Sequence, residues 1–331
     1  MRVLGMLAAF FVVVPIGGAA GARPSAPADT VRSLRATRSV LFGVASESGG
    51  NASAPLARVA GSVGKMPALF GSYVSFASPN FDRRLAESIR HQGATPLITW
   101  EAWSDGAIGR NQPEYALARF LHGDFDGYIR HWAEGARNWG GPLLLRFAPE
   151  MNADWNSWSA GVNGNSAAEY VAVWRRVHAL FDRVGARNVE WVWSPNVSFP
   201  GSTPLRRLYP GDRFVDWVGI DGYNWGASRP GAHWRTFDQV FAPTIRSIRR
   251  LTRKPLMLAE ISSAEQGGDK ARWISDFFRS LRKNPDILAF VWFDYDKEAD
   301  WRLDSSAAAR SAFASGIGDR RYRGAIPSYG G

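Results

Sequence analysis

The sequence predicts a single (β/α)8 barrel, and three observations support this fold class. Short apolar runs alternate with longer amphipathic segments from residue 39 onward, which is typical of parallel strands joined by helices. There are eight such runs, and the length of 331 residues fits one barrel. An open doubly wound sheet is the alternative, but residues 45–48 (ASES) stand where that fold carries a glycine-rich turn.

Each predicted strand is a run of apolar residues that could be buried on both faces of a sheet. In chain order the strands lie within residues 39–45, 68–76, 95–100, 143–149, 189–193, 216–221, 255–259 and 287–293. Helices are predicted at residues 80–91, 124–139, 167–184, 237–251, 271–282 and 307–314. The clearest is 167–184, because Val171, Trp174 and Val177 recur at helical spacing and Gly185 follows as a stop signal.

The N-terminus predicts export. Residues 1–22 form a secretory signal peptide, with a positive charge at Arg2, an apolar segment and small residues before the cleavage point. An uncleaved anchor is the alternative, although the apolar segment is short for a membrane span. Residues 23–38, rich in Pro, Ala and Ser, are predicted to be a disordered linker, and 39–331 to be the barrel. We therefore expect a secreted protein with no membrane contact once the signal is removed.

Composition excludes several kinds of site. The chain has no cysteine, which rules out disulfides, thiol catalysis and cysteine metal ligands, and none of its 5 histidines has zinc spacing. The acidic run at residues 294–300 lacks the glycine and closing glutamate of a calcium loop. The formal charge of +10 comes from scattered arginines, which favours a solvated surface over a nucleic-acid footprint. We expect no metal, no cofactor, no nucleic acid and a monomer.

Polar residues gather where the predicted strands end, which is the face that carries the chemistry in such barrels. They are Glu101, Glu150, Asn196, Asp221, Tyr223, Glu260 and Asp294, and tryptophans 100, 103, 155, 158, 225 and 292 lie among them. Aromatic rings stack on the apolar faces of sugars, and glycosidic bond cleavage needs two carboxyl groups. The pattern therefore favours hydrolysis of a polysaccharide. Trp191 and Trp193, which alternate on one strand, are expected to belong to the core instead.

Six segments taken in order resemble the strand-end motifs of glycoside hydrolase family 26. They are LITWEAW, LRFAPEMNADWNSW, WVWSPN, YPGDRFVDWVGIDGYNWG, KPLMLAEISS and DKEADWRLDSS, within residues 42–306. The resemblance implies a retaining (β/α)8 hydrolase with Glu150 as acid/base, Glu260 as nucleophile and Tyr223 bonded to that nucleophile. The family typically has histidine directly before the acid/base, where this chain has Pro149.

The resemblance also implies a set of substrate contacts. Arg146, Trp155, Asp221 and Trp292 match positions that line the cleft, and Trp100 and Glu101 resemble the strand-three contribution to the sugar site. Glu101 could instead be a structural partner of Arg146. Asn152, Trp158 and Trp225 complete the expected set.

The implied substrate is β-mannan or glucomannan, followed by mixed-linkage β-glucan or β-xylan, cut by endo action. Two rival functions remain open. One is a secreted barrel that binds polysaccharide without cleaving it, and the other is a basic protein that binds polyanions.

In the hydrolase, Glu150 must hold a proton, so we expect its pKa to be raised by partial burial and by the charge of Glu260.

Overall fold

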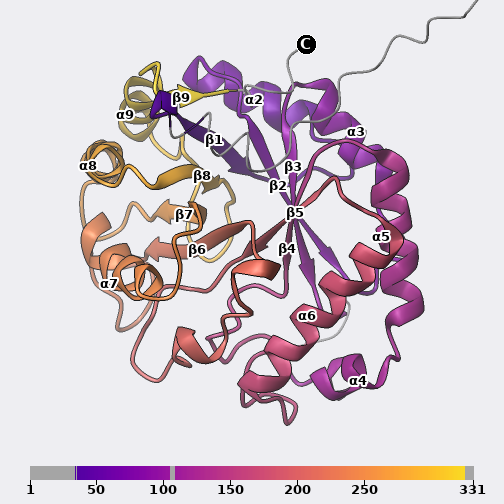
Figure 1. The fold of residues 1–331 in the computed structure, drawn as a ribbon. Coiled ribbons are helices and arrows are strands. Elements are labelled where there is room, and N and C mark those ends of the chain that lie inside the picture. The colour runs from indigo at the N-terminus through magenta and orange to yellow at the C-terminus, as the bar shows by residue number, and fades with distance from the viewer. Residues whose placement is uncertain (1–33, 35, 105–108, 325–331) are drawn as a thin grey trace, which may run out of the picture.

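Eight parallel strands close into a barrel in the computed structural model, which describes residues 34, 36–104 and 109–324. Each strand pairs with the next along the chain, and the last pairs with the first (Figure 1). The strands are β1 (Val40–Ala45), β2 (Leu69–Ser75), β3 (Thr95–Glu101), β4 (Leu143–Phe147), β5 (Val189–Trp193), β6 (Trp217–Asn224), β7 (Leu256–Ser263) and β8 (Ile287–Phe293). A two-residue strand, β9 (Tyr322–Arg323), adds to the start of β1. The predicted (β/α)8 fold is confirmed.

Helices surround the barrel (Figure 1). They are α2 (Ser53–Val63), α3 (Arg83–His91), α4 (Leu117–His122), α5 (Asp126–Trp139), α6 (Ala167–Val184), α7 (Phe237–Arg249), α8 (Lys270–Lys283) and α9 (Ala307–Ile317), with short 3-10 turns η1 (Pro113–Tyr115), η2 (Leu205–Arg207) and η3 (Asp212–Phe214). Within the described ranges no helix combines the length and the apolar character needed to cross a bilayer. The predicted signal peptide and most of the predicted linker lie outside the described residues.

Two helices, α2 and α4, were not predicted from the sequence. Helix α2 carries only three buried apolar residues, Leu56, Val59 and Val63, among alanines, serines and glycine, so its apolar stripe is thin. Helix α4 has six residues and lies between the predicted strand at residues 95–100 and the predicted helix at 124–139. Helix α6 matches its prediction and begins with a reciprocal capping box between Ser166 and Glu169.

Alternation along the strands divides the apolar residues into two clusters. On β4, Leu143, Leu145 and Phe147 pack with the helices, whereas Leu144 belongs to the cluster inside the barrel. Side chains two residues apart share a face, so Arg146 points into the barrel with Leu144. A polar group on the inner face near the strand's end is therefore directed at the mouth of the barrel.

Strand β7 breaks this alternation just before Glu260. The register of β6 against β7 steps from Ile220–Leu258 to Asp221–Glu260, so Ala259 is an extra residue on β7. Such a bulge re-aims the side chain that follows it. Ala259 lies with the interior cluster, and Glu260 also points inward instead of toward the helices. Strands β6 and β7 continue past their predicted ends at residues 221 and 259, so Tyr223 and Glu260 lie within strands and not after them.

Candidate active site

Glu260 is fixed by three donors at the carboxyl end of the barrel. Its Oε1 accepts hydrogen bonds from Arg146 Nη1 at 2.6 Å and from the Tyr73 hydroxyl at 2.8 Å. Its Oε2 accepts the hydroxyl of Tyr223, as the resemblance implied. Burial alone would raise the pKa of Glu260, but the charge of Arg146 and these three donors outweigh it and hold the pKa below its ordinary value. Glu260 is therefore ionised at neutral pH.

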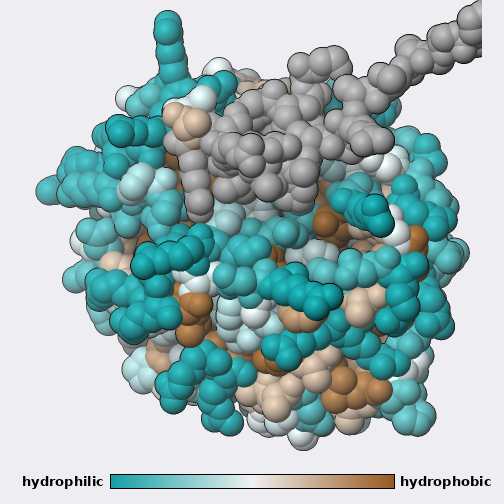
Figure 2. All heavy atoms as spheres, viewed as in Figure 1, coloured by the Kyte–Doolittle hydropathy of each residue, from teal (hydrophilic) through white to brown (hydrophobic). Residues whose placement is uncertain are grey.

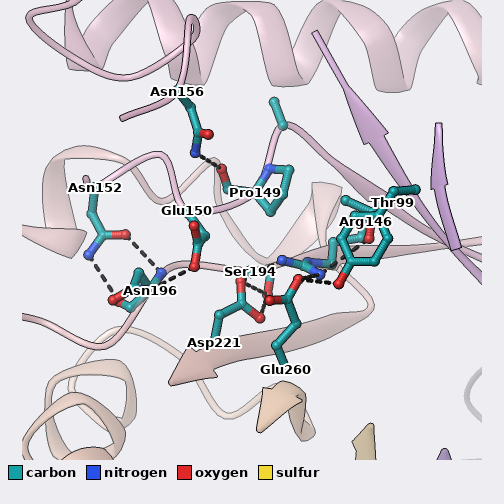
Figure 3. Close-up of polar contacts among 12 residues, drawn as sticks. Thr99, Arg146, Pro149, Glu150, Asn152, Asn156, Ser194, Asn196, Asp221 and Glu260 are labelled. Atoms are coloured by element: carbon teal, nitrogen blue, oxygen red, sulfur yellow. Dashed lines mark hydrogen bonds and ion pairs between the residues drawn. The ribbon is translucent and has the colours of Figure 1, made fainter. Parts of the chain in front are cut away.

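Arg146 joins Glu260 to a second buried carboxyl group. Its Nη2 lies 2.6 Å from Asp221 Oδ2, and its Nη1 also donates to Thr99 Oγ1 at 3.2 Å (Figure 3). Asp221 accepts a further bond from the Ser194 hydroxyl at 3.0 Å. Burial raises the pKa of Asp221 well above its ordinary value, Arg146 opposes the rise and the charge of Glu260 adds to it. The guanidinium thus serves mainly to keep Glu260 charged and correctly oriented.

Glu150 has only neutral partners. Its Oε1 accepts the side-chain amide of Asn196 at 2.6 Å (Figure 3). Its Oε2 accepts the indole N–H of Trp155 at 2.7 Å. Burial raises the pKa of Glu150 and the negative charge of Glu260 raises it further, while the bonds from Asn196 and Trp155 lower it in part. The pKa is raised overall, for the two reasons expected from the sequence.

The backbone that carries Glu150 is strained. Ala148 and Glu150, on either side of Pro149, both have positive φ, 43° and 53°. Each non-glycine residue in this region costs on the order of 1–3 kcal/mol and persists only where its surroundings fix it. The Glu150 N–H donates to the Ser194 carbonyl at 2.7 Å, and the Ala148 N–H donates to the Trp100 carbonyl at 2.9 Å. The turn is therefore bonded to both neighbouring strand ends.

Aromatic residues flank the two carboxyl groups. Trp155 is the one large apolar side chain with substantial exposure among the described residues, at 43%, and it stacks on Phe199 with ring centres 5.5 Å apart. Trp225, half-buried, lies beside Tyr223 and carries the guanidinium of Arg229 over its ring, 3.7 Å from the centroid. A hollow of about 650 Å³ adjoins the site through Tyr73 and Tyr295. Exposed and half-buried rings on both sides of the carboxyl groups are suited to a chain of sugars.

Glu101 points to the same mouth and, with Asp221, is a further carboxyl group near Glu150 and Glu260. It accepts the indole N–H of Trp103 at 3.2 Å, and burial raises its pKa to about 7, with smaller upward effects from Glu260 and Glu150. Arg146 forms its ion pairs with Asp221 and Glu260. The charge of Arg146 lowers the raised pKa of Glu101 only in part, and no ion pair between these two described residues is formed, so the Glu101 carboxyl group at the mouth could accept a sugar hydroxyl.

Several expected substrate contacts lie elsewhere. Trp100 and Trp292 are fully buried on the outer face of the barrel wall, where Trp100 stacks on Trp132 of α5 and Trp292 packs against Phe313 of α9. Neither can touch a substrate in this arrangement. Because side chains alternate along a strand, Glu101 faces the mouth and its neighbour Trp100 must face the helices. Trp191 and Trp193 are buried in the core, as expected.

Two other expected contacts support the site from beneath. Asn152 is buried and exchanges two hydrogen bonds with the backbone of Asn196, at 2.9 Å each. Asn196 in turn bonds Glu150. Trp158 is fully buried and donates to the carbonyl of Pro149 at 2.6 Å. Both residues act on the protein and not on a sugar.

Tyr73, Ser194 and Phe199 were not predicted as site residues. Tyr73 lies two residues before the end of β2, on the inner face with Leu69, and strand-end position plus alternation could have identified it. Ser194 and Phe199 follow β5, and their roles depend on a loop path that the sequence does not specify.

The acidic run at residues 294–300 forms ion pairs with arginine side chains. Asp294 pairs with Arg58, and Asp300 pairs with Arg302. Among the described residues no cluster of His, Cys, Asp or Glu is arranged to hold a metal ion.

Comparisons with known proteins identify one family and several relatives. The family model described as glycosyl hydrolase family 26 matches residues 95–264. Endoglucanase H of Acetivibrio thermocellus is 37% identical over 241 residues, which cover 71% of this chain and 26% of that protein. A mannan endo-1,4-beta-mannosidase of Bacillus subtilis is 31% identical over 91 residues, covering 26% of this chain and 24% of that protein. The chain thus matches about a quarter of the length of each of these relatives.

Solved structures share the fold. The catalytic domain of the Bacillus sp. JAMB-750 GH26 endo-beta-1,4-mannanase superposes with a TM-score of 0.69 at 20% identity, covering 93% of this chain and 94% of that one.

Proposed function

The chain belongs to glycosyl hydrolase family 26, and on this basis we propose that it is a retaining endo-β-glycanase with Glu260 as nucleophile and Glu150 as acid/base. The observation that carries the proposal is the contrast between the two carboxyl groups. Glu260 is held ionised by Arg146 and two tyrosines, whereas Glu150 has neutral partners and a raised pKa. Two carboxyl groups with opposed pKa shifts supply a nucleophile and a proton donor at the same pH.

In the first step, an oxygen of Glu260 attacks the anomeric carbon as the glycosidic bond breaks. Glu150 gives its proton to the departing oxygen, so the leaving chain is released as a neutral alcohol. The product is a covalent glycosyl ester of Glu260.

In the second step, water attacks the same carbon. Glu150 is now a carboxylate and takes a proton from the water, and the ester bond to Glu260 breaks. Esterification removes the negative charge of Glu260, which was one cause of the raised Glu150 pKa. Glu150 therefore becomes the stronger acid, and a better-populated carboxylate base, once the intermediate has formed.

The fixed groups around Glu260 support both steps. Arg146 and Tyr73 hold Oε1, while Tyr223 holds Oε2. These donors keep the carboxylate ionised for attack, and they stabilise it again as the leaving group of the second step. Since Arg146 is itself anchored by Asp221 and Thr99, little reorganisation is needed when charge shifts.

We propose a β-glucan backbone as the first substrate to test. The support is the similarity to an endoglucanase across 71% of the chain, against 26% for a mannanase. Mannan or glucomannan is the second candidate, supported by that mannanase and by the fold of the mannanase domain. The exposed Trp155–Phe199 stack beside the acid/base suits endo action, since a leaving chain of several sugars could rest on it.

The N-terminal sequence supports a proposal about where the protein works. We propose that residues 1–22 direct export and that the barrel works as a secreted monomer. Fractionation of the producing cells and light scattering of the purified protein test these two statements. Full-length protein retained in the membrane fraction would favour an anchor.

The deciding experiment is release of reducing ends from mixed-linkage β-glucan, glucomannan, galactomannan and β-xylan. Glu260→Ala is the control, because it removes the nucleophile. Release from one polymer that is lost in the variant establishes hydrolysis and the substrate class together. Proton NMR of the first products tests retention, which predicts β-anomers before mutarotation. Binding to a polymer without any release would instead support the non-catalytic barrel.

A further inference from the structure

We propose that Trp158 is a positioning residue for the acid/base, acting through the carbonyl oxygen of Pro149. The inference rests on the proposed function, because it assigns Trp158 a role in the proton transfer by Glu150. Sequence analysis had placed Trp158 among the sugar contacts, but its side chain is fully buried and cannot reach a ligand. Its indole N–H instead ends on the peptide that directly precedes Glu150, at 2.6 Å.

That peptide is the centre of the strained turn. Ala148 has positive φ although it precedes a proline, and a residue in that position normally adopts extended backbone. Glu150, on the other side, also has positive φ. Two disfavoured residues around one peptide will relax toward ordinary backbone unless the peptide is held.

The carbonyl of Pro149 is held from the loop that follows Glu150. It accepts the Trp158 indole N–H at 2.6 Å and the Asn156 side-chain amide at 3.3 Å, and the latter bond is visible in Figure 3. The preceding carbonyl, of Ala148, accepts the hydroxyl of Tyr170 from α6 at 3.1 Å. Trp158 therefore supplies the shorter of the two bonds to Pro149, from a fully buried ring that packs edge-on against Trp103.

A change at this peptide would be transmitted to the carboxyl group. Rotation about the backbone of Glu150 would take its two oxygens away from Asn196 and Trp155, which now hold them at 2.6 and 2.7 Å. Proton transfer is sensitive to such displacement, and a misplacement of about 1 Å can lower a rate about 100-fold. The geometry of Glu260 would stay intact, because its partners lie on β2, β4 and β6.

The test exploits this separation with two substrates. A polysaccharide has a poor leaving group and needs the proton from Glu150. A 2,4-dinitrophenyl β-glycoside of the backbone sugar has a good leaving group and needs only the attack by Glu260. The measured quantity is kcat/KM, which reports formation of the glycosyl-enzyme for both substrates.

Trp158→Phe keeps most of the buried ring and removes the N–H. We expect kcat/KM on the polysaccharide to fall roughly 10- to 100-fold and kcat/KM on the aryl glycoside to change less than about 3-fold. Trp174→Phe is the matched control, because Trp174 is also fully buried and donates its indole N–H to a backbone carbonyl, that of Phe214, at 3.0 Å. Trp174→Phe should leave the ratio of the two kcat/KM values at its wild-type level.

Equal losses on both substrates, or no loss on the polysaccharide, would overturn the proposal. Tyr170→Phe provides a second variant if Trp158→Phe does not fold, as judged by its thermal transition, and it should produce the same selective loss with smaller amplitude. An unchanged ratio in Tyr170→Phe would then count against the proposal. A wild-type protein that cleaves neither substrate would overturn the proposed hydrolase itself, an outcome distinct from an active wild type with unselective variants.

Discussion

Trp155 donates its indole N–H to Glu150 Oε2 at 2.7 Å while 43% of Trp155 is exposed. The same side chain is thus a hydrogen-bond donor to the proposed acid/base and one ring of a stack with Phe199. In the proposed mechanism, Trp155 therefore contributes both to binding of the leaving sugar and to protonation of its oxygen. The two roles can be separated, because phenylalanine keeps a ring and loses the donor.

Trp155→Phe should shift the basic limb of the kcat/KM profile to higher pH. The N–H of Trp155 favours the carboxylate form of Glu150 and lowers its pKa, so its loss raises the pKa and keeps Glu150 protonated to higher pH. Trp155→Ala should in addition raise KM roughly 2- to 10-fold, through lost stacking. Initial rates on the preferred polymer between pH 4 and 9 measure both effects. A basic limb that stays in place in Trp155→Phe would contradict the coupling.

Tyr73→Phe should shift the acidic limb, also to higher pH. Its hydroxyl donates to the Glu260 carboxylate and lowers the pKa of that group, so the variant needs a higher pH to ionise Glu260. We expect kcat/KM at the optimum to fall about 10-fold, the effect of losing a bond worth about 1.4 kcal/mol to a charged group. Tyr209→Phe is the control, because its hydroxyl bonds Asp212 instead. A Tyr73→Phe profile that overlays the wild-type profile would remove Tyr73 from the site.

The difference between Tyr73 and Tyr223 shows what sequence reasoning could reach. Tyr223 lies in a motif, DGYNW, that resembles a known family, and its bond to Glu260 is present. Tyr73 makes an equivalent bond but lies in LFGSYVS, a strand without a recognisable motif. The order of the strands and the two glutamates follow from local patterns, since apolar runs and strand-end carboxylates are close together in sequence.

Side-chain direction was the harder problem. Trp100 and Glu101 are neighbours, both were predicted to bind sugar, and only Glu101 faces the mouth. Strict alternation along β7 would direct Glu260 outward with Leu258, and the extra residue Ala259 reverses it. A bulge of one residue cannot be recognised from the amino-acid composition of the strand. The inward direction of Glu260 therefore could not be predicted, because it depends on how β7 pairs with β6 in three dimensions.

Arg146→Met should destabilise the fold by about 3–5 kcal/mol at neutral pH, the cost of leaving buried carboxylates without their cation. The pKa of Asp221, already raised in the wild type, would rise further, and that of Glu260 would move above its unfolded value, because Arg146 no longer opposes burial and mutual repulsion. A group whose folded pKa is raised loses stability as pH rises from its unfolded pKa, near 4, toward the folded pKa. The deficit relative to wild type should therefore be smallest near pH 4 and grow toward pH 7.

Urea unfolding of both proteins at a series of pH values measures this deficit. Arg249→Met is a suitable control, since Arg249 pairs with Asp286 at a partly exposed position on α7. Its deficit should stay within about 1 kcal/mol and change little with pH. A deficit in Arg146→Met that is constant with pH would mean that the guanidinium acts by packing instead of charge.

Glu150→Ala should separate the two steps of the reaction. Hydrolysis of the polysaccharide should fall roughly 10²- to 10⁴-fold, the usual contribution of a general acid. The 2,4-dinitrophenyl glycoside should still acylate Glu260, giving a burst of phenol followed by slow turnover, because water now lacks its base. Azide is a nucleophile that needs no base, so it should restore turnover and yield a β-glycosyl azide, detectable by mass spectrometry and NMR. An α-glycosyl azide from Glu150→Ala would mean that azide displaces the leaving group directly, without the glycosyl ester of Glu260. If azide instead restored turnover of Glu260→Ala and gave the β-glycosyl azide, the roles assigned to the two residues would have to be exchanged.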